Sequence, residues 1–255
     1  MRTRVARFRV ALVGFGAVTG LAALVAAVLV AVGGGEPRRG MFLGYLGEGH
    51  SSGRAVTWRD IPVPVGTVAG DVLVVEFAAS QDQLGALGAP AGWRYGCGAA
   101  VEGVAVGVWW RVAQAQEPGR WRFTAPAGSA AIGYMWRYAG IDPVEPFGRC
   151  RAGSGFGLRL DAPGLDAAGG DRALAVWAFT HAGNVPEPPS GYVQRTSGHT
   201  GHTGMAVSAA MADRVVGGCS TPTCPVPPVT AGAVMLRGEP RPHWVGLHFT
   251  LHAAA

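Results

Sequence analysis

The 255-residue chain contains no lysine, one asparagine and three isoleucines, so all 21 of its basic residues are arginine. This shortage is expected of a GC-rich genome that avoids AT-rich codons, and it makes the abundance of arginine partly a codon effect. Charged residues form only 15% of the chain, against about 25% in average soluble domains. The 41 glycines and 18 prolines predict many turns and argue against long helices.

The net charge of +5 does not indicate a nucleic-acid-binding protein. Arg2, Arg4, Arg7 and Arg9 precede every segment that could fold, so residues 36–255 contain 17 arginines and all 16 acidic residues, a net charge of +1. Nucleic-acid recognition needs a basic patch or stripe on the folded body. We therefore expect no nucleic-acid partner.

Residues 10–35 form a hydrophobic run in which Thr19 is the only polar side chain. A helix over residues 10–32 would be about 34 Å long, which is enough to cross a bilayer core. Four arginines precede the run and only two follow it closely, so the positive-inside rule places the N-terminus in the cytoplasm and the rest outside. We expect residues 1–35 to be a cytoplasmic tip and a single-pass signal-anchor, with the lipid bilayer as the partner of residues 10–32.

Other interpretations of this run stay open. Cleavage near Gly33 would release a secreted protein, although the apolar part of a cleavable signal is usually only about 7–15 residues long. The run also resembles a dinucleotide-binding turn, but Thr19 replaces the third glycine and the helix would lack a polar face. Gly16 and Gly20 form a GxxxG pair that could pack two membrane helices together, or simply reflect the small residues common in such helices.

Residues 36–40 form a linker, and the body over 41–255 contains short apolar stretches with a period of two between Gly/Pro turns. No stretch of the body has the period of a convincing amphipathic helix. This pattern predicts the all-β class.

The body also repeats itself. GDVLVVEF at 70–77 returns as GDRALAVWAF at 170–179, and PAGW at 90–93 returns as PSGY at 189–192. Two alternating strands recur at offsets of 101 and 113 residues: Val104, Val106, Val108 and Trp110 against Met205, Val207, Ala209 and Met211, and Ile132, Tyr134, Trp136 and Tyr138 against Val245, Leu247, Phe249 and Leu251. The jump in offset locates an insertion between Met211 and Val245.

These repeats predict one extracytoplasmic domain over 41–255. Its simplest architecture is a two-sheet, jelly-roll-like β-sandwich with quasi-repeats at about 55–140 and 157–252. Neither half looks able to bury its inner face alone, which argues against two separate domains. The pattern leaves the strand order open.

Four cysteines predict disulfide bonds in an exported chain, because the space outside the membrane is oxidising. They are Cys97, Cys150, Cys219 and Cys224, and three pairings exist. One pairing closes the short loop from Cys219 to Cys224 and leaves Cys97 with Cys150. Zinc is the competing interpretation, but a lone C-x4-C pair fits the usual spacings poorly, and we expect no metal.

Several motifs resemble catalytic ones but fail in context. GHSSG at 49–53 matches a nucleophile elbow by letter, yet no helix can follow it, so it is expected to be a turn between two strands. His199 and His202 lie in a Gly-rich loop, where surface histidines are the simpler explanation than a metal site. Asp142 and Glu145 lie beside prolines and are more typical of turns than of an acid/base pair. We therefore predict neither catalytic residues nor a cofactor.

Trp109 is the most informative aromatic residue, because the adjacent Trp110 belongs to the core-facing series of its strand. Alternation then places Trp109 and Arg111 on the outer face, and likewise Arg122 and Arg137 on their strands. If these strands share a sheet, the outer face offers a flat ring among guanidinium groups, which suits a polysaccharide with carboxylate or phosphate substituents. The alternative is that Trp109 packs under a loop and the arginines are ordinary solvated residues.

The paired motifs also resemble a known family. GDVLVVEF, PAGW, VGVWWRVA and AAIGYMWRYAGIDP, followed by GDRALAVWAF, PSGY and MADRVV, are similar in order and spacing to a recurrent bacterial and phage-associated β-sandwich module. The resemblance covers roughly residues 55–252. That family occurs in exported, surface-attached and tail-type proteins, largely without an assigned activity, so the resemblance implies a structural or binding part. The cystine insertion and the N-terminal anchor depart from the family pattern and argue against a phage-tail role.

Together these observations predict a membrane-anchored, extracytoplasmic surface-interaction or structural module without catalytic activity. Its expected partner outside the membrane is a cell-wall or surface polysaccharide or another surface protein. A carbohydrate-binding module that uses the face of Trp109, Arg111, Arg122 and Arg137 is the second hypothesis. A glycan or ester hydrolase is the third.

Overall fold

A computed structural model describes residues 44–201, 205–219 and 221–255, and the side chains from residue 57 onward. The membrane helix expected over residues 10–32, with Gly16 and Gly20, lies outside the described residues, as does His202. Within the described part of the chain, no helix is long and apolar enough to cross a membrane.

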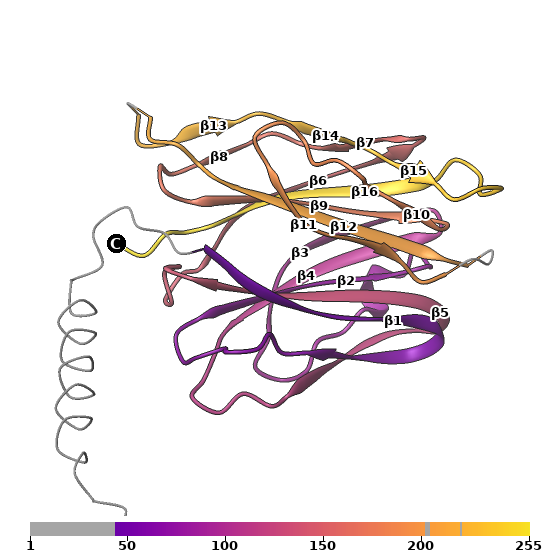
Figure 1. Ribbon diagram of the computed structural model, residues 1–255, viewed down its shortest axis with the longest axis horizontal. Helices are drawn as coiled ribbons and strands as arrows, with labels where there is room; N and C mark the ends of the chain where they lie inside the picture. Colours follow the sequence, from indigo (N-terminus) through magenta and orange to yellow (C-terminus); the bar gives the residue numbers. More distant parts are fainter. Residues whose placement is uncertain (1–43, 202–204, 220) are drawn as a thin grey trace, which may run out of the picture. The chain divides into compact units, whose positions relative to one another are not determined.

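The described chain is all-β, as predicted, and contains two five-stranded antiparallel sheets (Figure 1). Sheet 1 has the order β1-β5-β2-β4-β3, with bounds Gly44–Pro62 (β1), Val72–Ala79 (β2), Arg94–Val101 (β3), Val104–Val112 (β4) and Arg120–Ala139 (β5). Sheet 2 has the order β11-β12-β9-β16-β6, with bounds Phe147–Phe156 (β6), Arg172–Thr180 (β9), Val193–His199 (β11), Val207–Val215 (β12) and His243–Leu251 (β16).

The two sheets have the same internal order. Strands β1, β2, β3, β4 and β5 of sheet 1 correspond in position to β6, β9, β11, β12 and β16 of sheet 2. The chain therefore completes one sheet before it starts the other, and the jelly-roll-like connectivity expected from the sequence is wrong. The second half also begins earlier than expected, at Phe147, because β6 takes the place that β1 has in sheet 1.

Two further expectations need correction. The offset between β4 and β12 is 103 rather than 101 residues, because Val112 and Val215 occupy the same place in their ladders, opposite Val72 and Arg172. The turn expected at 49–53 is absent, because β1 runs through these residues and pairs with the long strand β5 along most of its length.

Each half begins its central strand with the same tight turn. Gly70 and Gly170 have φ angles of +92° and +95°, which residues with side chains rarely adopt. The aspartate that follows, Asp71 or Asp171, accepts a hydrogen bond from the backbone N–H three residues earlier. The Gly-Asp pair that marks both repeats in the sequence is therefore the turn that starts β2 and β9.

The core has three layers. The space between the sheets is filled by side chains of both, among them Trp136, Tyr138, Val176 and Leu247. A second apolar layer covers the outer face of sheet 1, beneath loops and the 3-10 turn Leu84–Ala86. The central strands are therefore buried on both sides, which explains why β2 and β9 are nearly continuous apolar runs.

The third layer lies on the outer face of sheet 2, around Trp177, Phe179 and Trp244. Two short ladders cover it: β7 (Arg159–Ala162) with β14 (Val229–Gly232), and β8 (Leu165–Ala167) with β13 (Cys224–Val226), at the top of Figure 1. A third ladder joins β10 (Gly183–Asn184) to β15 (Val234–Met235). The insertion expected between Met211 and Val245 thus supplies β13, β14 and β15.

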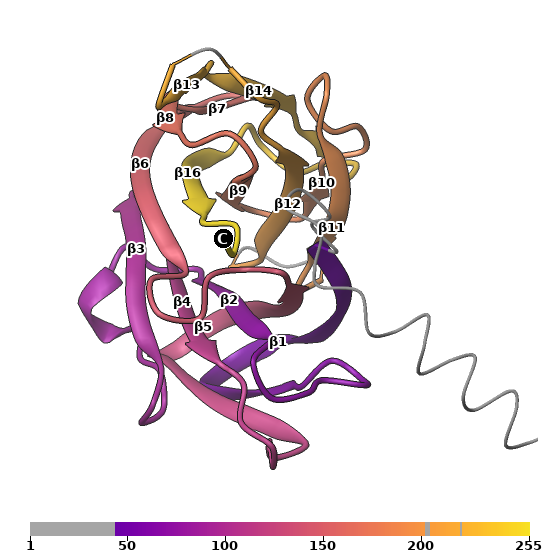
Figure 2. The ribbon, with the colours of Figure 1, turned by 90° about the vertical axis from the view of Figure 1, so that its left-hand side faces the viewer.

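Both disulfides of one predicted pairing are present. Cys97–Cys150 joins β3 to β6 and fastens the two sheets along one lateral edge, where these strands lie together in Figure 2. Cys219–Cys224 closes the loop before β13. The opposite edge of each sheet is formed by β1 and β11.

Candidate binding site

Trp109 does not form an exposed platform. It lies on the outer face of sheet 1, as alternation predicted, but only 6% of it is exposed. Its ring packs between Tyr95 and Phe123, with ring centroids 5.6 and 5.9 Å away. Gly107 leaves the space for it, because a Cβ there would come within 2.3 Å of the Trp109 ring. The expectation of a solvent-facing Trp109 is therefore wrong, because the ring is buried in the apolar layer on that face.

Arg111 shares the outer face with Trp109 and is also buried. Its Nη2 lies 3.1 Å from a carboxylate oxygen of Glu117. Its guanidinium group lies over the rings of Trp121 and Trp93, at 4.5 and 5.9 Å from the centroids. Arg111 thus joins the loop after β4 to the apolar outer layer.

Arg122 lies on the other side of its strand. Phe123 packs against Trp109 on the outer face, so the adjacent Arg122 points away from that face, and its expected place on the outer face is wrong. Its Nε and Nη2 donate to the two oxygens of Asp60 at 2.8 and 2.9 Å, and it stacks on Trp58. The bond from Arg122 lowers the pKa of the Asp60 carboxyl.

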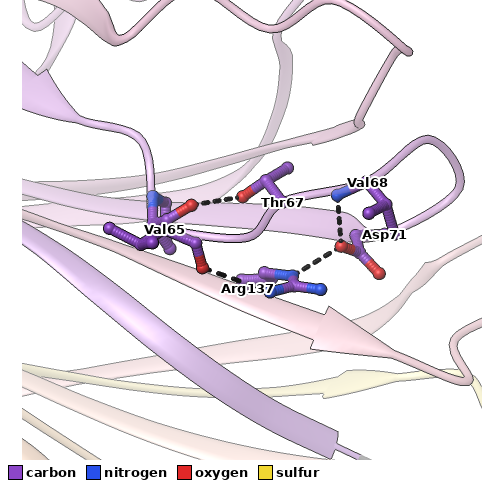
Figure 3. Close-up of polar contacts among 6 residues, drawn as sticks. Val65, Thr67, Val68, Asp71 and Arg137 are labelled. Carbon is purple, nitrogen blue, oxygen red and sulfur yellow. Dashed lines mark hydrogen bonds and ion pairs between the residues drawn. The ribbon is translucent and has the colours of Figure 1, made fainter. Parts of the chain in front are cut away.

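Arg137 fastens the turn before β2. Its Nε donates to Asp71, and its Nη1 donates to the carbonyl of Val65 at 3.3 Å (Figure 3). Asp71 accepts the N–H of Val68 at the same time. The four residues Trp109, Arg111, Arg122 and Arg137 therefore do not converge on one surface.

The second half contains a similar turn that resembles part of a catalytic triad. His252 Nδ1 lies 3.1 Å from Asp171 beside a pocket of about 380 Å³, which Thr250 also lines. Asp171 also accepts two backbone N–H groups, and in the first half the corresponding Asp71 takes Arg137 as its side-chain donor. Arg137 and His252 thus play the same part in the two turns, each as the side-chain partner of the turn aspartate. Stabilisation of the turn therefore explains the contact between His252 and Asp171.

A polar pocket lies at the opposite edge from the Cys97–Cys150 disulfide. It has a volume of about 530 Å³. Its lining comes from β5, β10 and β11 and is rich in hydrogen-bonding groups: Tyr134, Asn184, Arg195, Thr196, Ser197, Gly198 and His199.

Thr196 is the unusual member of this lining. It pairs with Met211 of the inter-sheet core and is 5% exposed, and its Oγ1 has no hydrogen-bond partner within the described part of the chain. An unsatisfied buried hydroxyl costs about 1–3 kcal/mol. Gly198, two residues on, leaves room beside it, because a Cβ there would come within 2.5 Å of the Tyr134 hydroxyl.

The position of Thr196 is equivalent to that of Cys97. Each residue follows a β-bulge and pairs with the corresponding residue of the next strand, Met211 or Val108. In sheet 1 this position carries the disulfide to β6. In sheet 2 it carries a hydroxyl beside a pocket, so the two lateral edges differ in chemistry at matching points of the fold.

A buried ionic network holds one wall of the pocket. Nε and Nη2 of Arg195 donate to Asp213 at 3.1 and 2.9 Å, and Arg172 forms an ion pair with the same carboxylate at 2.8 Å. The hydroxyl of Tyr138 donates to Asp213 at 3.0 Å. Burial, together with the charge of Asp213, raises the pKa of Tyr138. Arg195 is thus held in place by its carboxylate partner.

Among these lining residues, the sequence motifs pointed only to His199, which with His202 was expected to be a surface loop histidine rather than a metal ligand. His199 lines the pocket, and its Nδ1 accepts the N–H of Gly201 at 3.1 Å. The described residues contain no group of three metal-ligating side chains. The missed signal was the alignment of PAGWRYGC with PSGYVQRT, which places Thr196 opposite Cys97.

The pocket can therefore accept hydrogen bonds from, and donate them to, a small polar ligand at the edge of β11. No protein family, curated protein or solved structure matches this chain in the comparisons.

Proposed function

We propose that the protein is a non-catalytic, extracytoplasmic binding module, a sandwich of two quasi-repeats held at a membrane by the helix expected over residues 10–32. The pocket beside β11 carries this proposal, because it combines a positioned polar lining with the hydroxyl of Thr196, which has no partner in the described part of the chain. Two disulfides support the location, since such bonds persist in oxidising compartments and are rare in the cytosol. The partner is a surface polysaccharide or a surface protein.

Location is tested on the full chain carrying a C-terminal epitope tag in bacterial cells. Protease added to intact cells should remove the tag, and the four cysteines should react with a maleimide only after reduction. Replacing Arg2, Arg4, Arg7 and Arg9 by Glu should lower the fraction of exposed tag, because it removes the positive-inside signal. A protected tag with four reactive thiols in the unmodified chain would refute the extracytoplasmic location.

Binding is tested with the purified full chain in lauryldimethylamine oxide micelles, which carry no sugar headgroup. The chain is passed over immobilised polysaccharide and protein fractions from the surface of the producing cells. Gly198→Ala should reduce retention, because its Cβ would lie within 2.5 Å of the Tyr134 hydroxyl. Gly232→Ala is the matched control, since a Cβ on that strand glycine meets nothing within 4 Å.

Two results would count against this function. One is that neither fraction retains the unmodified chain. The other is that both glycine variants are retained equally well, which would place the binding surface away from β11.

A further inference from the structure

We propose that the pocket beside β11 binds one ring of an uncharged saccharide, and that a hydroxyl of this ring bonds to Oγ1 of Thr196. This inference deepens the proposed binding function and rests on it. The volume of about 530 Å³ lies within the range of about 300–1,000 Å³ for small-molecule sites. The fit to a sugar comes from the kind of hydrogen-bonding groups that line the pocket.

The hydroxyl of Thr196 can either donate or accept a hydrogen bond, so a ligand atom that does one or the other would satisfy it. Its hydroxyl is nearly fully buried in the pocket wall and has no partner within the described residues. A sugar hydroxyl meets either requirement, because it carries one donor and two acceptor sites. A purely apolar ligand would leave the cost of the unpaired Thr196 hydroxyl in place.

Ser197 and Asn184 extend the same chemistry. The oxygen of Ser197 accepts the N–H of Val185 at 2.8 Å, which leaves its own O–H to donate toward the pocket. The side-chain amide of Asn184 offers a carbonyl acceptor and two donors. A ring with several adjacent hydroxyls can match both the donors and the acceptors of this set, whereas a fully ionised anion can only accept hydrogen bonds.

The charges around the pocket argue against an anionic ligand. Arg195 directs Nε and Nη2 at Asp213, and Arg172 contacts the same carboxylate. A ligand phosphate or carboxylate would compete with a fully buried aspartate for these guanidinium groups. A neutral hydroxyl can be accepted without disturbing the network.

The β11 edge of sheet 2 differs chemically from the equivalent edge of sheet 1, and this difference favours a ligand in the pocket. At the equivalent position of sheet 1, Cys97 is covalently bonded to Cys150 and the sheet edges are fastened together. At Thr196 the β11 edge instead carries a pocket with a threonine hydroxyl. A bound saccharide would form a hydrogen bond with the Thr196 hydroxyl, which has no partner among the described residues.

The test uses the purified full chain in lauryldimethylamine oxide micelles and saturation-transfer NMR. The probes are glucose, galactose, mannose, N-acetylglucosamine and glucuronate, followed by the monodeoxy analogues of the tightest neutral binder. We expect at least one neutral sugar to bind, and one particular deoxy analogue to bind about 3–10-fold more weakly, as loss of one neutral hydrogen bond requires.

Thr196→Val keeps the shape of the side chain and removes its hydroxyl. This variant should bind the parent sugar about 3–10-fold more weakly and should no longer distinguish it from that one deoxy analogue. Thr124→Val, at an exposed position of β5, is the matched control and should retain both the affinity and the discrimination. A role of Thr196 confined to folding would not produce this specific loss of discrimination.

Three outcomes would overturn the inference. They are binding of no sugar, binding that Thr196→Val leaves unchanged, and glucuronate binding more than tenfold tighter than every neutral sugar. The retention assay with surface fractions separates this failure from failure of the proposed function. If retention depended on Gly198 but not on Thr196, the proposed binding function would stand. The inference that a saccharide bonds to the Thr196 hydroxyl would be wrong.

Discussion

The hydroxyl of Tyr138 on β5 donates a hydrogen bond to Asp213 on β12, at 3.0 Å, and so connects the two sheets through the core between them. Asp213 is fully buried and is also bound by Arg172 and Arg195. One carboxylate thus neutralises part of two guanidinium charges and also accepts the hydroxyl of Tyr138. We expect this network to matter more for stability than any exposed ion pair.

Asp213→Asn should destabilise the fold by about 3–5 kcal/mol, because it removes the buried negative charge that Arg172 and Arg195 both contact. Tyr138→Phe removes one hydrogen bond to a charged group and should cost about 1.5–3 kcal/mol. Chemical denaturation of both single variants and the double variant gives the coupling energy. Additive effects, or a smaller loss for Asp213→Asn than for Tyr138→Phe, would contradict the network.

Glu76 should make the protein less stable as the pH rises. Its carboxyl is fully buried among apolar residues, both of its oxygens lack partners in the described chain, and this burial raises its pKa well above the usual range. A raised pKa in the folded state means that stability is full below the unfolded pKa, about 4.3, and is lost as the pH rises through the folded pKa.

Glu76→Gln keeps the shape and cannot ionise, so the difference in unfolding free energy between this variant and the unmodified protein should increase in favour of the variant from pH 4 upward. Glu76→Leu should add about 1–3 kcal/mol at neutral pH by removing the unsatisfied group. Denaturant titrations at several pH values measure both effects. A difference that does not change with pH would show that Glu76 finds a partner or solvent.

His248 should have the opposite dependence on pH. Its Nδ1–H donates to the carbonyl of Pro163 at 2.8 Å, and its Nε2 accepts the hydroxyl of Tyr192 at 2.7 Å, which is the neutral form. Burial lowers the pKa of His248 to about 4. Stability is therefore present above the unfolded pKa, about 6.5, and is lost as the pH falls toward 4.

The shift to about 4 corresponds to about 3 kcal/mol lost between pH 7 and pH 4. His248→Asn retains a donor toward Pro163 and removes the titration, so it should be less stable at pH 7 but lose less on acidification. His243→Asn, at a half-buried position, is the control. Equal acid sensitivity of His248→Asn and the unmodified protein would rule out this assignment.

The sequence predicted the class of fold because two signals are local. Alternation along each strand and the recurrence of Gly-Asp and Pro-x-Gly-aromatic turns need no knowledge of the packing, and the turns at Gly70 and Gly170 have the backbone that the repeat implied. Alternation also placed Trp109 and Trp110 on opposite faces. It did not reveal that both faces of sheet 1 are buried, and this is why the exposure of Trp109 was wrong.

The pocket could not be derived in the same way. Tyr134, Asn184 and Thr196 come from three strands, and only the packing of sheet 1 against sheet 2 brings β5 and β11 to one pocket. That Oγ1 of Thr196 finds no partner among the residues that the structure describes is a property of the folded chain. The repeat alignment of Thr196 with Cys97 was the one local signal, and it becomes meaningful only when the disulfide is known to close an edge.

Trp109→Ala should act on stability. Its ring is packed against Tyr95 and Phe123, so truncation should cost about 3–5 kcal/mol through a cavity in the outer layer. Trp58→Ala, at a position that is 42% exposed, should cost much less and is the control. Thermal and chemical unfolding measure the difference, and equal losses at the two positions would contradict the burial of Trp109.

The two disulfides should differ in their contribution to stability. Cys97 and Cys150 are 53 residues apart and join the edges of the two sheets, whereas Cys219 and Cys224 are 5 residues apart within one loop. A disulfide stabilises the folded state by lowering the entropy of the unfolded chain, and this effect grows with loop length. It amounts to about 4 kcal/mol for the first crosslink and about 2 kcal/mol for the second. Replacing Cys97 and Cys150 together by Ser should therefore lower the midpoint of unfolding more than replacing Cys219 and Cys224.

The comparison must be made between oxidised proteins, with each double variant retaining the other disulfide. The Cys219/Cys224 variant should still bind any ligand of the β11 pocket, because its loop lies before β13 and supplies no residue to that pocket. A larger loss of stability without the Cys219–Cys224 disulfide would contradict this expectation. It would mean that this disulfide stabilises the ladder of β8 and β13 by more than its loop entropy. The sheets would then depend on their shared core more than on the Cys97–Cys150 link.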